Sequence, residues 1–106
     1  MVTYYDNVKS KDLGNGCTRR ILSHSGSLML VEFTFQKDAI GALHSHIHEQ
    51  TGYILYGSFE FEIDGKKSVL KKGDSYYVPS NAVHGVVALE NSAILDSFTP
   101  QREDFL

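Results

Sequence analysis

Short segments of strand-forming residues, separated by turns, recur along the whole chain and constrain its fold more than any other feature. Residues 59–63 alternate apolar and acidic side chains, which is the period-two pattern of a strand with one buried face. Asp64-Gly65 follows, and this dipeptide is typical of a β-hairpin turn. Since no segment has the period of an amphipathic helix, the sequence predicts an all-β sandwich or small antiparallel β-barrel.

Runs rich in apolar, β-branched and aromatic residues give the positions of the predicted strands: 19–23, 28–35, 51–56, 59–63, 68–70, 75–78, 84–89 and 93–98. Pro79 ends one of them, because it has no N–H to donate to a ladder. We expect residues 1–18 to form an irregular N-terminal arm or a short edge strand. Only a helical turn is expected after Pro100. A small fold of this kind can hold a ligand at one mouth.

Length and composition limit the class of protein. The 106 residues suffice for a single domain, 1–106, with one core. The formal net charge of -3 offers no basic surface, so no nucleic-acid partner is expected. There is no long apolar run and no signal peptide, so we expect no membrane association. The one cysteine, Cys17, cannot form an internal disulfide, which is typical of a cytoplasmic protein.

Histidines gather in one stretch of the chain. His44 and His46 are two residues apart, so on a strand they would point to the same face. His48 and Gln50 continue that spacing, and periodicity alone does not exclude either of them as a further ligand. Imidazole is a good ligand for several divalent ions. Together with the distant His84, this cluster favours a metal site over a set of surface histidines.

The C-terminal segment contains an acid inside an apolar run. Asp96 and Phe98 would share one face of the last predicted strand. Burying a carboxylate is costly unless it is paired or used. From the residues alone two interpretations stay open: Asp96 faces a site, or it is an exposed edge charge with Arg102 as a solvated tail residue.

Two motifs in the sequence resemble those of the cupins. The first cupin motif has two histidines, an acidic residue and a glycine, and the second has a glycine, a proline and a histidine. The matching residues here are His44, His46, Gln50, Gly57, Gly73, Pro79 and His84. The resemblance implies a small antiparallel β-barrel of double-stranded jelly-roll type. It also implies one bound divalent metal ion, such as zinc, nickel, iron or manganese.

Gln50 stands where the cupin motif has an acid. Three neutral imidazoles and a carboxylate leave a divalent site with a net charge of about +1, whereas an amide leaves it at about +2. The ion then polarises an anionic oxygen ligand more strongly and is bound less tightly. The substitution favours a role in polarising carbonyl or carboxylate groups over oxygen chemistry.

Residues 96–106 resemble the C-terminal end of a narrower group, the KdgF-type cupins of pectin and alginate breakdown. This resemblance implies the conversion of cyclic 4,5-unsaturated uronates to linear ketonised sugars, with residues 99–106 closing the pocket. The catalytic residues that it implies are Asp96, Phe98 and Arg102. The implied metal ligands are His44, His46, Gln50 and His84. The expected substrate is therefore a small anionic sugar.

The residue types suit that reaction. Arg102 would grip the sugar carboxylate, Asp96 would move a proton, and Phe98 would pack against the sugar. Two other classes stay open: a metal-dependent dioxygenase or sugar isomerase, and a non-catalytic ligand-binding or sensor cupin. We also expect a homodimer, because open sheet edges invite pairing.

Overall fold

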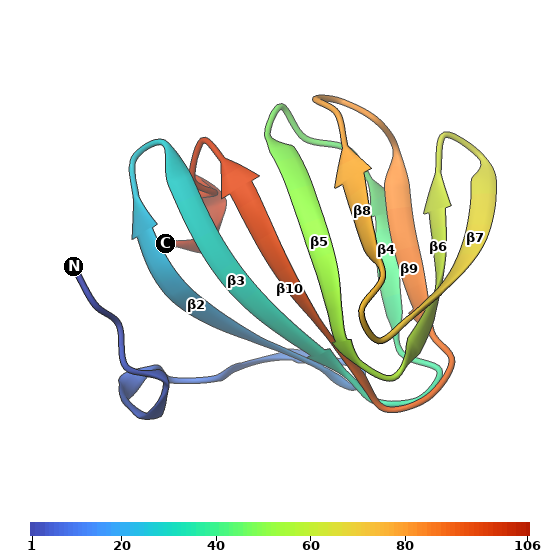
Figure 1. The fold of residues 1–106 in the computed structure, drawn as a ribbon, viewed down its shortest axis with the longest axis horizontal. Coiled ribbons are helices and arrows are strands. Elements are labelled where there is room, and N and C mark those ends of the chain that lie inside the picture. Colours follow the sequence, from blue (N-terminus) through green and yellow to red (C-terminus); the bar gives the residue numbers. More distant parts are fainter.

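The protein, described over all of residues 1–106 by a computed structural model, is built almost entirely of antiparallel strands (Figure 1). The elements are η1 (Tyr5–Asn7), β1 (Lys11–Gly14), β2 (Cys17–Ser25), β3 (Leu28–Phe35), β4 (Ile40–His44), β5 (Glu49–Tyr56), β6 (Ser58–Ile63), β7 (Lys66–Lys71), β8 (Ser75–Val78), β9 (His84–Ala88), β10 (Ser92–Thr99) and η2 (Glu103–Phe105). No helix here has the length and apolar character that crossing a membrane requires.

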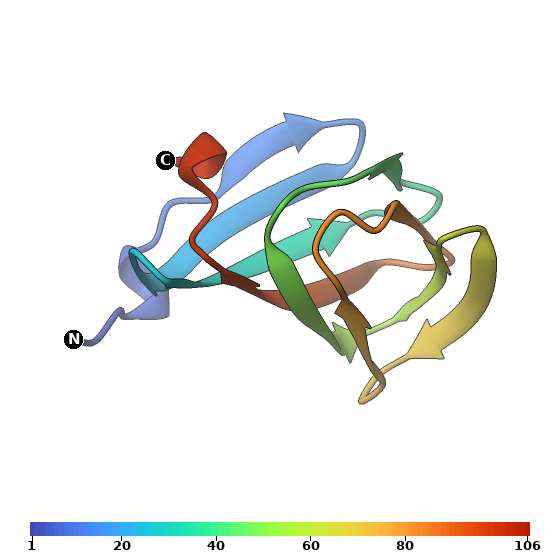
Figure 2. The same cartoon turned by 90° about the horizontal axis from the view of Figure 1, so that it is seen from above.

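The strands form two sheets that face each other (Figures 1 and 2). One sheet has the order β1-β2-β3-β10-β5-β8 and the other has the order β4-β9-β6-β7. The predicted all-β fold is therefore confirmed. Hydrogen bonding does not continue from one sheet to the other, so the two layers form an open sandwich rather than a closed barrel. The edge strands are β1, β8, β4 and β7.

The core lies between the two sheets and is filled by the inward faces of alternating strands. Strand β5 shows why, because burial alternates along it and places Gln50, Gly52 and Ile54 on its inner side. Phe35 and Phe59 meet edge to face there, with ring centroids 5.2 Å apart. Each fully buried side chain of this size contributes roughly 1.5–3 kcal/mol of hydrophobic stabilisation.

Most predicted strands appear within a few residues of their expected bounds, but the histidine stretch differs. Strand β4 was not predicted, and it ends at His44. His46 therefore lies in the loop that follows, so the period-two argument, which applies only if both histidines lie on one strand, does not hold for this pair. The pairing of β4 with β9 is irregular between Gly41 and His44, which ends the regular alternation. The loop is held by Asn81, whose N–H donates to the His46 carbonyl at 2.7 Å.

The two ends of the chain lie beside the larger sheet (Figure 2). Residues 11–14 form the edge strand β1, which pairs with β2. The C-terminal segment turns back after β10. It is fixed by the Gln101 N–H, which donates to the Gly26 carbonyl at 3.0 Å, and by a 2.8 Å contact between the Gln101 amide oxygen and His24 Nδ1. This return places Arg102 and Phe105 against the pocket described below.

Candidate metal centre and adjoining pocket

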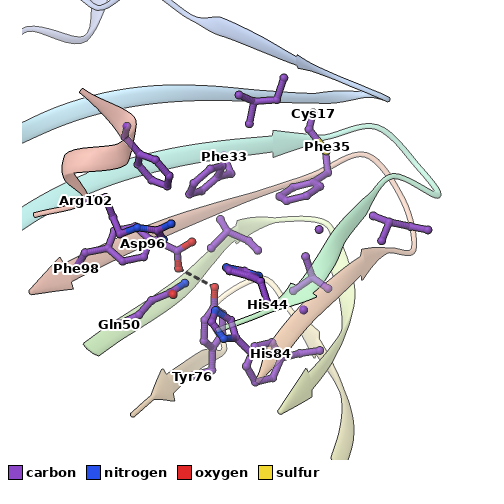
Figure 3. Close-up of a pocket in the computed structure, with 18 of the residues that line it drawn as sticks. Cys17, Phe33, Phe35, His44, Gln50, Tyr76, His84, Asp96, Phe98 and Arg102 are labelled. Atoms are coloured by element: carbon purple, nitrogen blue, oxygen red, sulfur yellow. Dashed lines mark hydrogen bonds between the residues drawn. The ribbon is translucent and has the colours of Figure 1, made fainter. Parts of the chain in front are cut away.

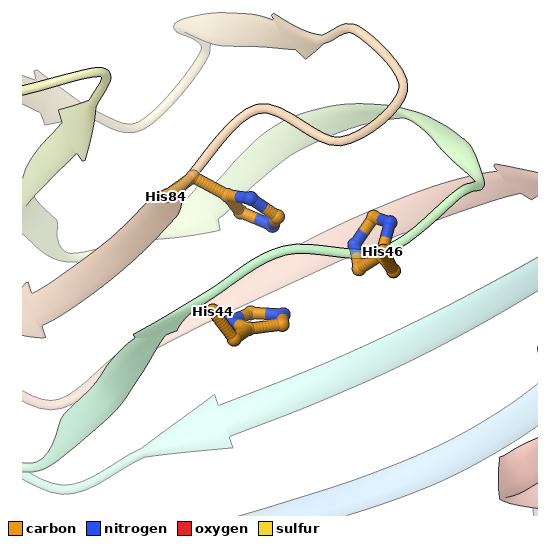
Figure 4. Close-up of side chains that lie close together, drawn as sticks. All are labelled: His44, His46 and His84. Atoms are coloured by element: carbon orange, nitrogen blue, oxygen red, sulfur yellow. The ribbon is translucent and has the colours of Figure 1, made fainter.

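Three histidine rings converge from separate segments of the smaller sheet and its loop (Figure 4). His44 ends β4, His46 follows in the loop, and His84 begins β9. His44 and His84 are direct partners in the β4–β9 pairing, and their ring centroids are 4.4 Å apart. One nitrogen from each ring lies within 4.8 Å of the other two.

Backbone carbonyls determine which nitrogen of each ring carries the proton. Nδ1 lies 2.9 Å from the Ala42 carbonyl in His44, 3.0 Å from the His48 carbonyl in His46, and 3.0 Å from the Ala82 carbonyl in His84. A carbonyl only accepts, so each Nδ1 is the donor and each neutral ring keeps its lone pair on Nε2. Metal-binding histidines in proteins are commonly held by such a bond from the other ring nitrogen.

The His84 ring also shows what kind of group fits here. Its Nε2 is buried and has no hydrogen-bond partner within the chain. Burial lowers the pKa of His84 to about 4, with the neighbouring His44 and His46 adding to the effect. Burial, followed by the charge of Arg102, also lowers the pKa of His46. These rings are therefore neutral at neutral pH, and an unpartnered lone pair in a ring of nitrogens fits a divalent cation.

Gln50 adds an oxygen to this group. Its side chain is buried, and its Oε1 lies 3.1 Å from Nε2 of His46. Because that Nε2 carries a lone pair, two acceptors face each other, and a shared cation satisfies both. The separation suits two ligands of one ion, since a typical zinc–ligand bond is about 2.1 Å. The His48 ring lies 5.4 Å from that of His46 and is outside the three-histidine cluster.

A pocket of about 310 Å³ adjoins the histidines (Figure 3). Most of its polar side chains gather at one end, and these are His44, Gln50, Tyr76, His84, Asp96 and Arg102. The remaining wall is mainly apolar and includes Phe33, Phe35, Phe61, Ile94, Phe98 and Phe105. A mostly apolar cavity with a few convergent polar groups is the usual form of a small-molecule site.

Asp96 projects from β10 into this polar end and is buried. The hydroxyl of Tyr76 donates to its Oδ1 at 2.6 Å. Burial raises the pKa of Asp96 to about 6, against the opposing effects of hydrogen bonds from Tyr76 and Gln50 and the charge of Arg102. A carboxyl group that titrates near neutral pH inside a pocket is suited to accepting and returning a proton.

Arg102 is buried in the same pocket and is held in a fixed orientation. Its Nε and Nη2 donate to the two carboxylate oxygens of Asp104 at 3.0 and 2.8 Å. The guanidinium carbon lies 4.3 Å from the ring centroid of Phe105 and 5.1 Å from that of Phe98. Asp104 thus occupies one edge of the guanidinium, and Nη1 on the other side is available to an anionic ligand.

The structure therefore brings together most residues that the sequence singled out. His44, Gln50, His84, Asp96, Phe98 and Arg102 line one pocket, and His46 meets Phe98 edge to face with ring centroids 5.8 Å apart. Tyr76 was not among the site residues predicted from the sequence. A signal was present in Gly52, because a glycine inside a strand often marks a close approach by another group.

Comparison with known proteins agrees with the motifs. The family description "Cupin domain" matches residues 31–95. The pectin degradation protein KdgF of Dickeya dadantii is 47% identical over 103 residues, which is 95% of this chain and 94% of that protein. The resemblance to KdgF-type cupins is thereby confirmed.

Solved structures extend the likeness to the whole fold. KdgF from Halomonas sp. superposes with a TM-score of 0.95 at 37% identity, covering 100% of this chain and 98% of that one. An RmlC-like cupin from Shewanella frigidimarina superposes with a TM-score of 0.96 at 36% identity, covering 99% and 95%. The jelly-roll architecture expected from the motifs is thus confirmed. This chain belongs to the cupin family, with the KdgF proteins among its relatives.

Proposed function

We propose that this protein is a metal-dependent enzyme that converts cyclic 4,5-unsaturated uronates to linear ketonised sugars. The observation that carries the proposal is the arrangement of Asp96 and Arg102, which share one pocket with the histidine cluster. The relationship to a protein of pectin degradation supports a substrate of this class, because pectin is a polymer of uronates. The pocket volume of about 310 Å³ suits a small molecule of this kind.

The chemistry of such a substrate matches the polar end of the pocket. An unsaturated uronate has a carboxylate, an enol ether and a hemiacetal. The unoccupied edge of the Arg102 guanidinium binds the carboxylate, and Phe98 packs against the sugar and excludes water. The metal ligands that we propose are His44, His46, Gln50 and His84. A divalent ion held there supplies Lewis-acid polarisation of a sugar oxygen.

Asp96 carries the proton transfer in this proposal. Its carboxylate accepts the proton of the anomeric hydroxyl as the bond between C1 and the ring oxygen breaks. An aldehyde forms at C1, and the ring oxygen is left as an enolate. Asp96 then returns the proton to C4, and the enolate becomes a ketone, so the reaction is a balanced isomerisation. A pKa of about 6 allows the group to act first as a base and then as an acid.

The proposal includes a cytoplasmic homodimer. The single cysteine, Cys17, is free and buried, which suits a reducing compartment. The open edges of β1, β8, β4 and β7 offer strands for pairing between subunits.

The test is a substrate assay with metal analysis. Purified protein is incubated with unsaturated galacturonate made by a lyase, and loss of the enol-ether absorbance is followed. We expect acceleration by the parent protein and loss of most of it in Asp96→Ala and Arg102→Ala, with bound metal unchanged. Lys67→Ala removes an exposed cation that does not line the pocket and serves as the control.

Two results would contradict this assignment. One is undiminished turnover by Asp96→Ala or Arg102→Ala. The other is no acceleration by the metal-loaded parent, which would favour a dioxygenase, another sugar isomerase or a non-catalytic binding protein. Oxygen uptake with diketones or flavonols then identifies the dioxygenase.

A further inference from the structure

We propose that Tyr76 is a positioning residue whose hydroxyl fixes the orientation of the Asp96 carboxylate in the pocket, in a space that Gly52 keeps open. The inference rests on the proposed function, in which Asp96 transfers the proton. It adds to that function a residue pair that the cupin motifs do not contain.

The three residues form one row across the larger sheet. Gly52 of β5 pairs with Tyr76 of β8 on one side and with Asp96 of β10 on the other. Residues in direct register have side chains on the same face of a sheet. Neighbouring strands lie about 4.8 Å apart, so Tyr76 and Asp96 are separated by two such spacings, and the tyrosine must reach over the middle strand.

Gly52 makes this reach possible. A Cβ atom at Gly52 would lie 2.1 Å from Cζ and 2.4 Å from the hydroxyl oxygen of Tyr76. Any other residue would therefore collide with the rigid aromatic ring. The backbone of Gly52 does not adopt a positive φ, so turn geometry does not explain the glycine. The requirement is for space above the strand, and the tyrosine ring fills that space.

The tyrosine ring is also held from its other side. It stacks on Phe61 of the facing sheet, with ring centroids 4.3 Å apart and an interplanar angle of 17°. The hydroxyl therefore has a fixed position, and it donates to Oδ1 of Asp96 at 2.6 Å (Figure 3). Because one carboxylate oxygen is fixed, the orientation of the other is fixed as well. Gln50 also hydrogen-bonds this carboxylate, but without the Tyr76 bond the group turns more freely about its terminal torsion, which has only broad minima.

Removing only the hydroxyl tests the proposal. We expect Tyr76→Phe to lower kcat about ten- to hundredfold, as loss of a hydrogen bond to a charged group does, with KM changed by less than about twofold. Gly52→Ala should likewise lower kcat with little change in KM, because the added methyl group displaces the Tyr76 ring. Metal content should be unchanged in Tyr76→Phe. In an Asp96→Asn background, Tyr76→Phe should lower the remaining rate by less than about twofold.

The neighbouring Tyr77 provides a matched control. Its hydroxyl also donates to a carboxylate, that of Glu49, but its side chain is exposed and does not line the pocket. Tyr77→Phe should keep the parent kcat. An unchanged kcat in Tyr76→Phe, or an effect just as large in the Asp96→Asn background, overturns the proposal, since either shows that the hydroxyl does not act through Asp96.

A crystal structure of Tyr76→Phe separates this inference from the proposed function. We expect the Asp96 carboxylate to be rotated in Tyr76→Phe and unmoved in Tyr77→Phe. If the parent protein does not act on unsaturated uronates, the proposed function fails, and the carboxylate orientation still decides the role of Tyr76. A carboxylate that keeps its place in Tyr76→Phe overturns the positioning role.

Discussion

Replacing Asp96 with asparagine should make the fold more stable at neutral pH while removing most, but not all, of the proposed activity. Burial raises the pKa of Asp96 from 3.8 to about 6. A carboxyl group whose pKa is higher in the folded state disfavours folding once it is ionised. This cost is absent below the unfolded pKa of 3.8, grows as the pH rises towards 6, and is complete above that value.

The magnitude follows from the size of the shift. A displacement of about two pKa units corresponds to about 3 kcal/mol of unfolding free energy. The side-chain oxygen of asparagine still accepts from the Tyr76 hydroxyl. Its NH2 group, however, faces the Gln50 side chain, which donates a hydrogen bond to Asp96 in the parent, so two donors then face each other. That mismatch costs about 1 kcal/mol, which leaves a net stabilisation of about 2 kcal/mol. In a domain of this size the melting temperature should rise by about 10 °C.

Thermal unfolding of the metal-free proteins at several pH values is the assay. Asp96→Asn should melt higher than the parent at about pH 7.5. Below about pH 4, where the carboxyl is protonated in both states, the order should reverse, because only the mismatch of about 1 kcal/mol remains. Asp6→Asn, at an exposed acid in the N-terminal segment, should show no such difference and is the control. A variant that melts below the parent at pH 7.5 would refute the claim that the ionised Asp96 carboxylate destabilises the folded state.

Three further outcomes are expected. Gln50→Glu should bind zinc more tightly in a competition titration but turn over substrate more slowly, because the site loses net positive charge. Asp104→Asn should raise KM several-fold with a smaller change in kcat, because Arg102 loses its bidentate partner; steady-state kinetics measures both. In metal-free Asp96→Asn, the melting temperature should fall as the pH drops from about 6.5 to 4, because the low folded pKa of His84, about 4, makes protonation favour the unfolded chain.

The strand pattern was predictable because its signals are local. Period-two alternation in residues 59–63 and the turn at Asp64-Gly65 correspond directly to β6 and the hairpin that follows it. The spacing of histidines identified the candidate ligands for a similar reason, since it reflects a family motif. It did not reveal the local geometry, because β4 ends at His44 and tertiary contacts with the next loop place His46.

The contacts around Asp96 depend on register, which local pattern does not give. Tyr76 meets Asp96 only because β8 and β10 both pair with β5 at Gly52. A shift of one residue in either pairing would turn the side chain to the opposite face. The pair of hydrogen bonds from Arg102 to Asp104 likewise depends on how residues 100–106 turn back after β10. Residue identities therefore suggested the chemistry, whereas sheet register determines how it is organised.

The amide at position 50 has a physical explanation in these contacts. Its oxygen faces the His46 nitrogen at 3.1 Å, while a hydrogen bond from its side chain helps to keep Asp96 ionised. A glutamate there would offer an oxygen to a cation but no N–H to Asp96. Two buried carboxylates would then share one small space, and repulsion would force one of them to hold a proton. Glutamine therefore weakens the binding of a cation, but it lets the cation site adjoin the proposed proton-transferring acid without a second buried carboxylate beside it.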